Sequence, residues 1–324
     1  MIRLLLSLFV LAILIGTGIG YLLFSRMAAI PGPLQQNKII YIAPGTPVNG
    51  IALQLKSEAA IDAVWVFRLQ ARLQAQAGTL KAGEYEIKAQ ASVNDILDVL
   101  RLGKTYQRQL TIPEGLMSFE IANLINAAEM MTGEIVDIPP EGSLLPDTYS
   151  YTRHENRTAF MVRLQTRMQQ TVEQLWQARA ENLPLKTPQE AVILASVVEK
   201  ETGVASERAK VAGVFINRLR RGMPLQSDPT SIYALTEGKF RLDRALLRKD
   251  LEIKSPYNTY QVNGLPPGPI ANPGKAALEA ALQPESHDYL YFVADGTGGH
   301  AFGKTLAEHN DNVARWRALQ KTKK

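Results

Sequence analysis

Cysteine is absent from the 324 residues of this chain, and histidine occurs only four times. A chain without cysteine forms no disulfide and has neither a thiol nucleophile nor a thiolate ligand. The spacing of His287, His300 and His309 matches no zinc motif. We therefore expect no metal site and no cofactor.

The sequence also lacks a clustered basic stripe and any recognisable nucleic-acid-binding motif. Its formal net charge is +5, which suits an acidic partner in general. Because no basic stripe or binding motif directs this charge toward DNA or RNA, we expect no nucleic-acid partner. The length is sufficient for two domains and a sizeable core.

One long uncharged run stands near the start of the chain. Residues 4–24, LLLSLFVLAILIGTGIGYLLF, match the roughly 20 apolar residues that a bilayer-spanning helix needs. A cleaved signal peptide is the alternative, but its apolar core would be about 7 to 15 residues long. Residues 25–29 also offer no pair of small residues spaced for cleavage. We predict a membrane anchor, with residues 1–3 as a short tail before it.

Two segments of different character follow the anchor. Residues 25–37 contain Pro31, Gly32 and Pro33 without clear periodicity, so we interpret them as a tether. Residues 38–104 have the pattern of a small α/β module, with Asp95 at a capping-box position after Ser92. Its expected strands lie at 39–42 and 83–88, and its expected helices at 45–55, 65–75 and 92–100.

A faint internal repeat extends beyond this module. The four residues Ile42, Gly45, Ile51 and Ala52 recur in the same order and spacing at Ile112, Gly115, Ile121 and Ala122. The common offset suggests two related strand-turn-helix units.

Residues 105–324 form the expected larger domain. Residues 156–180 have apolar side chains at three-to-four spacing, which predicts a helix packed on the core, with Trp176 beside it for packing rather than as a sugar platform. Ser206 is expected to cap a later helix that ends near Arg221. The remaining expectations are an irregular connection at 111–151, a rigid Pro/Gly-rich groove wall at 265–274, a hairpin at 289–302 and a closing helix at 306–320. These mixed elements predict an α+β fold.

A buried helix should begin at Pro188. Thr187 offers a hydroxyl at the N-cap, Pro188 suits the first helical position and Glu190 completes a capping-box pattern. The helix is apolar on nearly every side, which indicates an element buried in the core. Two carboxylates, Glu199 and Glu201, stand in its last turns.

Glu201 is the stronger candidate for a proton donor. At helical spacing it follows Leu194, Val197 and Val198, so it extends the bulkier apolar stripe of the helix. Such surroundings should raise its pKa from about 4.3 toward roughly 6. The alternative is a carboxylate that only pairs with a cation at the helix end, such as Lys200, Arg208 or Lys210.

The sequence around this helix resembles a known family. The stretch at 195–235, ASVVEKETGVASERAKVAGVFINRLRRGMPLQSDPTSIYAL, together with PYNTY at 256–260 and GLPPGPIANPG at 264–274, is similar to the MltG (YceG-like) endolytic murein transglycosylases. The resemblance covers nearly the whole chain. It implies a lyase that cleaves peptidoglycan glycan strands, with the second Glu of EKET, Glu201, as the catalytic acid.

The same resemblance implies where the protein works. It places a short tail in the cytoplasm, one helix in the inner membrane and everything after residue 24 in the periplasm. It also implies that residues 38–104 are a LysM-like subdomain, and that penicillin-binding proteins or other peptidoglycan synthases are partners. The stem-peptide carboxylates of peptidoglycan suit the basic balance of the chain.

Six further residues lie in the motifs that carry the resemblance and offer hydroxyls, amides or flat rings for sugar binding. They are Asn217, Gln226, Asp228, Tyr257, Asn258 and Tyr260. Turn and capping chemistry explains each of them equally well.

One acid suffices for a lytic transglycosylase but not for a hydrolase. A glycoside hydrolase ordinarily uses two carboxylates, and Asp228 or Glu207 could be the second. In a transglycosylase the C6 hydroxyl of N-acetylmuramic acid attacks C1 instead of water. A hydrolase and a non-catalytic glycan-binding scaffold are the alternatives to a transglycosylase.

Soluble transglycosylases carry a Glu-Ser pair before a GLMQ run. In this chain Glu201 precedes Thr202 and no GLMQ exists, so we do not assume a lysozyme-like fold.

Overall fold

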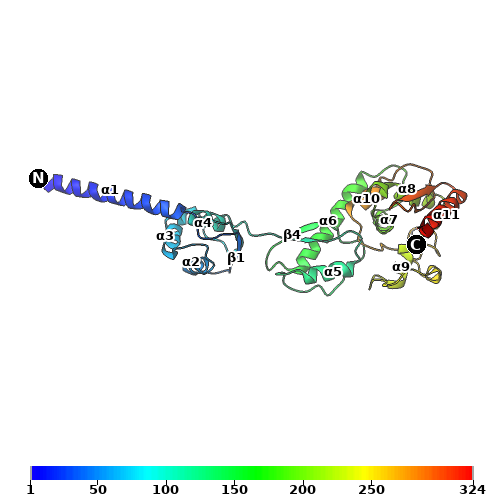
Figure 1. The fold of residues 1–324 in the computed structure, drawn as a ribbon, viewed down its shortest axis with the longest axis horizontal. Helices are drawn as coiled ribbons and strands as arrows, with labels where there is room; N and C mark the ends of the chain where they lie inside the picture. The colour runs from blue at the N-terminus through cyan, green and yellow to red at the C-terminus, as the bar shows by residue number, and fades with distance from the viewer. Residues whose placement is uncertain (1, 323–324) are drawn as a thin grey trace. The chain divides into compact units, whose positions relative to one another are not determined.

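The computed structural model describes residues 2–322 and contains two compact units, Met1–Arg108 and Gln109–Lys324. The division lies a few residues beyond the expected boundary at residue 104. The architecture is mixed, with helices and three two-stranded sheets, β1 with β2, β3 with β4 and β5 with β6 (Figure 1). The predicted α+β class agrees with this architecture.

The first unit consists of a long N-terminal helix and a small α/β module. Helix α1 is long and apolar enough, by length and composition, to cross a membrane. In the module, β1 pairs with β2 in antiparallel register, with Ile40 opposite Tyr85. The elements are α1 (Ile2–Ala29), β1 (Lys38–Ile42), α2 (Val48–Ser57), α3 (Val64–Leu73), the 3₁₀ turn η1 (Ala75–Ala77), β2 (Gly83–Ile87) and α4 (Val93–Leu102).

Local sequence signals explain this module well. Ser92 caps α4, and its side chain and that of Asp95 form the expected reciprocal capping box. Gly103 ends the same helix in a left-handed conformation with φ 69°. The side chains of Phe67 and Tyr85 are fully buried at the centre of the module's core. All five predicted strands and helices are present, with ends shifted by a few residues.

The segment interpreted as a tether, residues 25–37, packs onto the first unit along part of its length. Helix α1 continues to Ala29, because Phe24 and Ala28 pack against Val66 of α3. Leu34 enters the core of the module. Gly32 donates its backbone N–H to the carbonyl of Gln90, and a Cβ there would lie 2.4 Å from the carbonyl oxygen of Ala91. The Pro/Gly composition therefore reflects close packing.

The second unit contains the remaining elements. They are β3 (Arg108–Thr111, starting at the boundary), α5 (Ser118–Ala127), β4 (Thr148–Tyr151), α6 (Arg157–Gln177), α7 (Pro188–Glu201), η2 (Ala205–Glu207), α8 (Arg208–Arg220), α9 (Asp228–Thr236), η3 (Arg248–Glu252), α10 (Lys275–Leu282), β5 (Tyr291–Ala294), β6 (His300–Gly303) and α11 (Leu306–Thr322). The predicted hairpin and closing helix are confirmed as β5, β6 and α11.

Several expectations for this unit were wrong or incomplete. Helix α5 and strand β4 lie where we expected an irregular connection, and α9 and α10 had no predicted counterpart. Ser206 caps no helix, because it lies inside the turn η2 and α8 begins after Glu207. The end of α8 is as expected, with Gly222 at φ 64° just beyond it. Thr187 caps α7, but Glu190 bonds the N–H of Lys186, so only half of the capping box forms.

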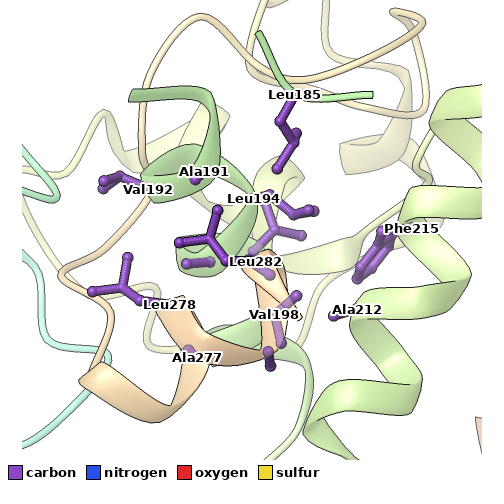
Figure 2. Packing of buried hydrophobic residues seen from close by; sticks show 14 of the residues in the cluster. Leu185, Ala191, Val192, Leu194, Val198, Ala212, Phe215, Ala277, Leu278 and Leu282 are labelled. Atoms are coloured by element: carbon purple, nitrogen blue, oxygen red, sulfur yellow. The ribbon is translucent and has the colours of Figure 1, made fainter. Parts of the chain in front are cut away.

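Helix α7 is the buried centre of the second unit. All eight residues at 191–198 are buried, as the apolar sequence predicted. Helices α6, α8 and α10 pack around it. Figure 2 shows Leu194 and Val198 of α7 facing Phe215 of α8 and Leu282 of α10. The Pro/Gly-rich segment at 265–274 is largely buried rather than a groove wall, and the N–H of Ile270 bonds the hydroxyl of Ser196.

We expect Leu194→Ala to destabilise the second unit by about 2 to 5 kcal/mol, because a fully buried leucine leaves a cavity when it is truncated. Leu306→Ala is a matched control, since that leucine is 58% exposed on α11, and should change stability by less than about 0.5 kcal/mol. Urea unfolding of the detergent-solubilised chain measures both. Equal losses in the two variants would contradict this description of the core.

Candidate active site

Glu201 is the last residue of α7, and its side chain is partly buried in the second unit. The hydroxyl of Ser227 donates a hydrogen bond to Oε1 at 2.5 Å. Among residues 2–322 this is the only hydrogen bond to the carboxyl, so Oε2 has no protein donor. One oxygen is therefore fixed and the other is available to hold a proton.

Burial raises the pKa of Glu201 to about 7. The nearby carboxylate of Asp228 also raises this pKa, while the Ser227 hydroxyl, His300 and Arg218 lower it. The net result is a carboxyl group that still holds its proton near neutral pH. The pKa of Glu201 is raised, in the direction predicted from its apolar surroundings.

Ser227 is held by a buried network of hydroxyls. Its N–H donates to the hydroxyl of Thr259 at 3.0 Å, and its carbonyl accepts from the hydroxyl of Thr230 at 2.6 Å. The two threonine hydroxyls bond each other at 2.8 Å. Ser227, Thr230 and Thr259 are all fully buried. The two threonine hydroxyls therefore hold the backbone of Ser227, and the Ser227 hydroxyl is left to bond Glu201.

Arg218 is a buried cation of the same site that the sequence analysis missed. Its guanidinium donates to the carbonyls of Leu290 at 2.7 Å and Leu225 at 2.8 Å, and lies 5.3 Å from the ring centroid of Tyr291. Burial lowers the pKa of Arg218, and its charge lowers the pKa of Glu201. A signal was present: Arg218 continues the buried stripe of Val211, Val214 and Phe215 on α8, where an apolar residue is usual.

Asp228 and Tyr260 lie near enough to Glu201 to interact with it electrostatically. The hydroxyl of Tyr260 donates to Oδ1 of Asp228 at 2.7 Å. Asp228 is exposed at the first turn of α9, and Tyr260 is partly buried. Burial and this carboxylate raise the pKa of Tyr260. Exposed Gln226 adjoins them, and its side-chain oxygen accepts a hydrogen bond from Arg218 at 3.4 Å.

Two of the six candidate sugar-binding residues have structural roles. Asn217 donates from its amide to the carbonyls of His287 and Tyr289, at 2.7 and 3.1 Å. Asn258 is fully buried, and its amide is hydrogen-bonded to three backbone groups and to the hydroxyl of Ser231. Direct contact with a glycan is not compatible with that burial. Tyr257 remains accessible, with its ring 4.8 Å from that of Tyr233.

Glu199 is buried as well, so burial alone does not separate the two acids. Its side chain is 6% exposed, and burial raises its pKa. The difference is in the bonding: Oε2 of Glu199 accepts the backbone N–H of Gly274 at 2.9 Å, and Arg208 lies 3.9 Å from Oε1. Glu199 therefore ties α7 to the 265–274 segment, whereas Glu201 is held through one hydroxyl only.

Glu141 is a second carboxyl whose pKa burial raises to about 7, and nothing in its local sequence marks it. Its oxygens accept the N–H of Ser118 at 3.1 and 3.0 Å and the amide of Asn272 at 3.2 Å. Asn272 also bonds the N–H of Leu144 at 2.9 Å. These contacts join the start of α5, the loop at 141–144 and the segment at 265–274, which is a structural role.

His300 lies close to the site but binds a carboxylate. Its Nδ1 lies 2.7 Å from Oε2 of Glu207, and its N–H bonds the other oxygen at 3.1 Å. Among the side chains that the structure describes, no three His, Asp or Glu residues converge as metal ligands.

A groove with a volume of about 700 Å³ lies elsewhere on the second unit. Met168 and Trp176 of α6 and Pro188 and Val192 of α7 line it. Glu201 is at the opposite end of α7, roughly 20 Å along the helix. The groove is therefore separate from the candidate active site.

Comparison with known proteins identifies the family. Residues 40–315 match the YceG-like family. The chain is 32% identical over 302 residues to the endolytic murein transglycosylase of Bacillus subtilis, covering 84% of this chain and 82% of that protein. It is 30% identical over 333 residues to the endolytic murein transglycosylase of Streptococcus pneumoniae, covering 87% of this chain and 59% of that protein.

A crystal structure of a YceG-like protein from Listeria monocytogenes superposes with a TM-score of 0.52 and 30% identity. The match covers 86% of this chain and 99% of that one. The chain belongs to the YceG-like family.

The raised pKa of Glu201 predicts a pH-dependent gain in stability for Glu201→Gln. The pKa is about 7 in the folded chain against an ordinary 4.5, so the folded state binds the proton more tightly than the unfolded chain does. Wild-type stability therefore falls as pH rises from about 4.5 to 7, by about 3 kcal/mol, while the neutral amide loses nothing. Urea unfolding should show Glu201→Gln gaining on wild type at pH 8 relative to pH 5.

Glu279→Gln serves as the control, because this glutamate is half exposed on α10. It should show no comparable pH-dependent gain. A difference between Glu201→Gln and wild type that is the same at pH 5 and pH 8 would contradict a raised pKa at Glu201.

Proposed function

We propose that this chain is a membrane-anchored endolytic lytic transglycosylase that cleaves the bond between N-acetylmuramic acid and N-acetylglucosamine within peptidoglycan strands. One observation supports this most strongly: the carboxyl of Glu201 keeps its proton up to a pH of about 7 and presents Oε2 without a protein donor. The relatives named endolytic murein transglycosylases support the choice of polymer and the lyase class.

In the proposed mechanism Glu201 acts first as acid and then as base. The carboxyl proton moves to the glycosidic oxygen, the bond from C1 to that oxygen breaks, and N-acetylglucosamine leaves with a new hydroxyl. The carboxylate then takes the proton of the C6 hydroxyl, whose oxygen bonds C1 and closes a 1,6-anhydro ring. Glu201 ends protonated and no water is consumed. An attacking hydroxyl within the substrate also avoids the entropic cost of positioning water.

Asp228 supports this chemistry electrostatically in our proposal. Its negative charge raises the pKa of Glu201, which keeps the carboxyl group of Glu201 protonated. Arg218 and Ser227 act in the opposite sense and stabilise the carboxylate that forms after proton transfer. A hydrolase that used Asp228 as second carboxylate remains the alternative, and the products distinguish the two reactions.

We propose that Gln226, Asp228, Tyr257 and Tyr260 contact the glycan, because each reaches the surface near Glu201 or on the adjoining loop. Asn217 and Asn258 contribute by holding the backbone of that loop and of the 287–289 segment. The sugar rings would stack on the tyrosines, and the amide and carboxylate would bond their hydroxyls.

The placement in the cell is proposed from α1 and from the family. Helix α1 would span the inner membrane once, with the tail in the cytoplasm and both units in the periplasm. Because residues 25–34 fold onto the first unit, that unit would stay next to the bilayer, where nascent strands emerge. We also propose that residues 38–104 are a LysM-like subdomain and that peptidoglycan synthases such as penicillin-binding proteins are partners.

Glu201→Gln should abolish cleavage, because an amide can neither donate nor accept the required proton. Mass spectrometry of purified glycan strands should show 1,6-anhydro ends with the wild-type chain and uncut strands with the variant. Glu199→Gln is the matched control and should retain the chemistry, with a cost in stability. Reducing ends in the products would instead support the hydrolase. An absence of cleavage by the wild-type chain would support the glycan-binding scaffold. Activity lost in Glu199→Gln and kept in Glu201→Gln would reverse our choice of acid.

Ser227→Ala should move the basic limb of the pH–rate profile upward by about one pH unit, because its hydroxyl lowers the pKa of Glu201. Ser231→Ala is the control: this serine is equally buried but bonds Asn258. It should leave the limb in place. A limb that stays fixed in Ser227→Ala would show that Glu201 does not set it.

A further inference from the structure

Helix α3 carries an apolar stripe that faces away from the core of the first unit. Trp65, Leu69 and Leu73 stand at helical spacing and are 53%, 40% and 51% exposed. Arg68 and Arg72 alternate with them on the same exposed face. The ten residues of α3 include no acidic side chain. Large apolar side chains that are exposed next to one another indicate an interaction surface.

This face continues the surface of α1. The ring of Trp65 lies 6.0 Å from that of Phe24, at the end of the expected membrane span. Phe24 and Ala28 pack on Val66, the next residue of α3. In Figure 1, α3 runs across the end of α1, on the side of the module that faces back along this helix. A bilayer around α1 would therefore meet α3 at its surface.

We propose that α3 is an interfacial helix that lies on the same membrane that α1 spans. Trp65, Leu69 and Leu73 enter the boundary between headgroups and acyl chains, and Arg68 and Arg72 bind the phosphates of anionic lipids. This arrangement of aromatic, aliphatic and cationic side chains is typical of helices that lie in the bilayer interface.

A groove beside this face supports the same occupant. It has a volume of about 610 Å³ between α2 and α3, with Val48, Trp65 and Leu69 as apolar lining and Arg68 and Arg72 as its cations. An acyl chain with its phosphate matches that combination of an apolar floor and positive charge. The inference depends on the proposed anchoring by α1 and not on the proposed chemistry of Glu201.

The arrangement gives α3 a mechanical role. With a single spanning helix as its only membrane contact, the first unit can tilt relative to the membrane surface. A second contact through α3 fixes the tilt of the first unit and its distance from the bilayer.

The absence of cysteine allows a direct test on the full chain. Leu69→Cys and Leu102→Cys each provide one site for an environment-sensitive fluorophore. Leu102 is the control, because it is 74% exposed at the end of α4, while the start of that helix at Val93 packs near α1. The proteins are reconstituted in vesicles of phosphatidylethanolamine and phosphatidylglycerol, with bromine atoms placed high on the acyl chains.

The label at position 69 should lose about half of its fluorescence to the brominated lipid, as expected for a group in the interface, and the label at position 102 should lose little. In the Leu69→Cys chain, adding Arg68→Gln and Arg72→Gln should reduce that quenching, as should replacing phosphatidylglycerol by phosphatidylcholine. Quenching that does not respond to either change would overturn the assigned phosphate contacts.

Equal, weak quenching at both positions in protein that floats with the vesicles would overturn the inference and leave the anchor intact. Protein that does not float with the vesicles would contradict the anchor and the inference together. A label at position 69 that becomes buried in detergent as protein concentration rises would indicate a second copy and would also contradict the proposal. None of these outcomes depends on glycan cleavage, which is measured separately.

Discussion

The burial of one carboxyl group at the end of α7 is the constraint on which the proposed chemistry of the second unit depends. Every residue from 191 to 198 is buried, and helices α6, α8, α9 and α10 contact α7, so the helix places Glu201 where little water surrounds it. Burial raises the pKa of this carboxyl to about 7, against the opposing effects of the Ser227 hydroxyl, His300 and Arg218. Glu201 keeps its proton because desolvation raises its pKa by more than these groups lower it.

This arrangement has a substantial energetic cost. A pKa of about 7 instead of 4.5 corresponds to about 3 kcal/mol against the ionised form in the folded chain, a large share of the roughly 5 to 15 kcal/mol that stabilises a typical domain. The apolar packing of α7 offsets this cost. The network of Thr230, Thr259 and Ser227 then limits the motion of the carboxyl, so that the destabilised group also has a defined position.

Local sequence signals predicted elements that depend on local chemistry. The Ser92 and Asp95 box, the Thr187 cap and the all-round apolar pattern of α7 each led to the observed helix. The internal repeat was informative too, since Gly45 and Gly115 both have positive φ, at 78° and 73°, between a strand and a helix. It pointed to α5, although the irregular composition of that stretch led us to expect a connection there.

The parts that the sequence could not predict depend on contacts distant in the chain. Glu199 and Glu201 are both buried, and they differ in their partners: Glu199 has the N–H of Gly274 and Arg208, and Glu201 has the hydroxyl of Ser227. The sequence position of Asn258 suggested an amide that binds sugar. In the structure its amide oxygen and nitrogen are already hydrogen-bonded within the protein. The Pro/Gly segment at 25–37 was interpreted as a tether because composition does not reveal that Gly32 packs against a neighbouring carbonyl.

Carbon NMR measures the protonation of Glu201 most directly. The chain is labelled with ¹³C at the glutamate carboxyl carbons, and Glu201 is assigned by comparison with Glu201→Gln. Its resonance should titrate with a pKa of about 7. A midpoint near the ordinary value of 4.5 would show that this carboxyl is ionised at neutral pH, and the acid role assigned to it would be wrong.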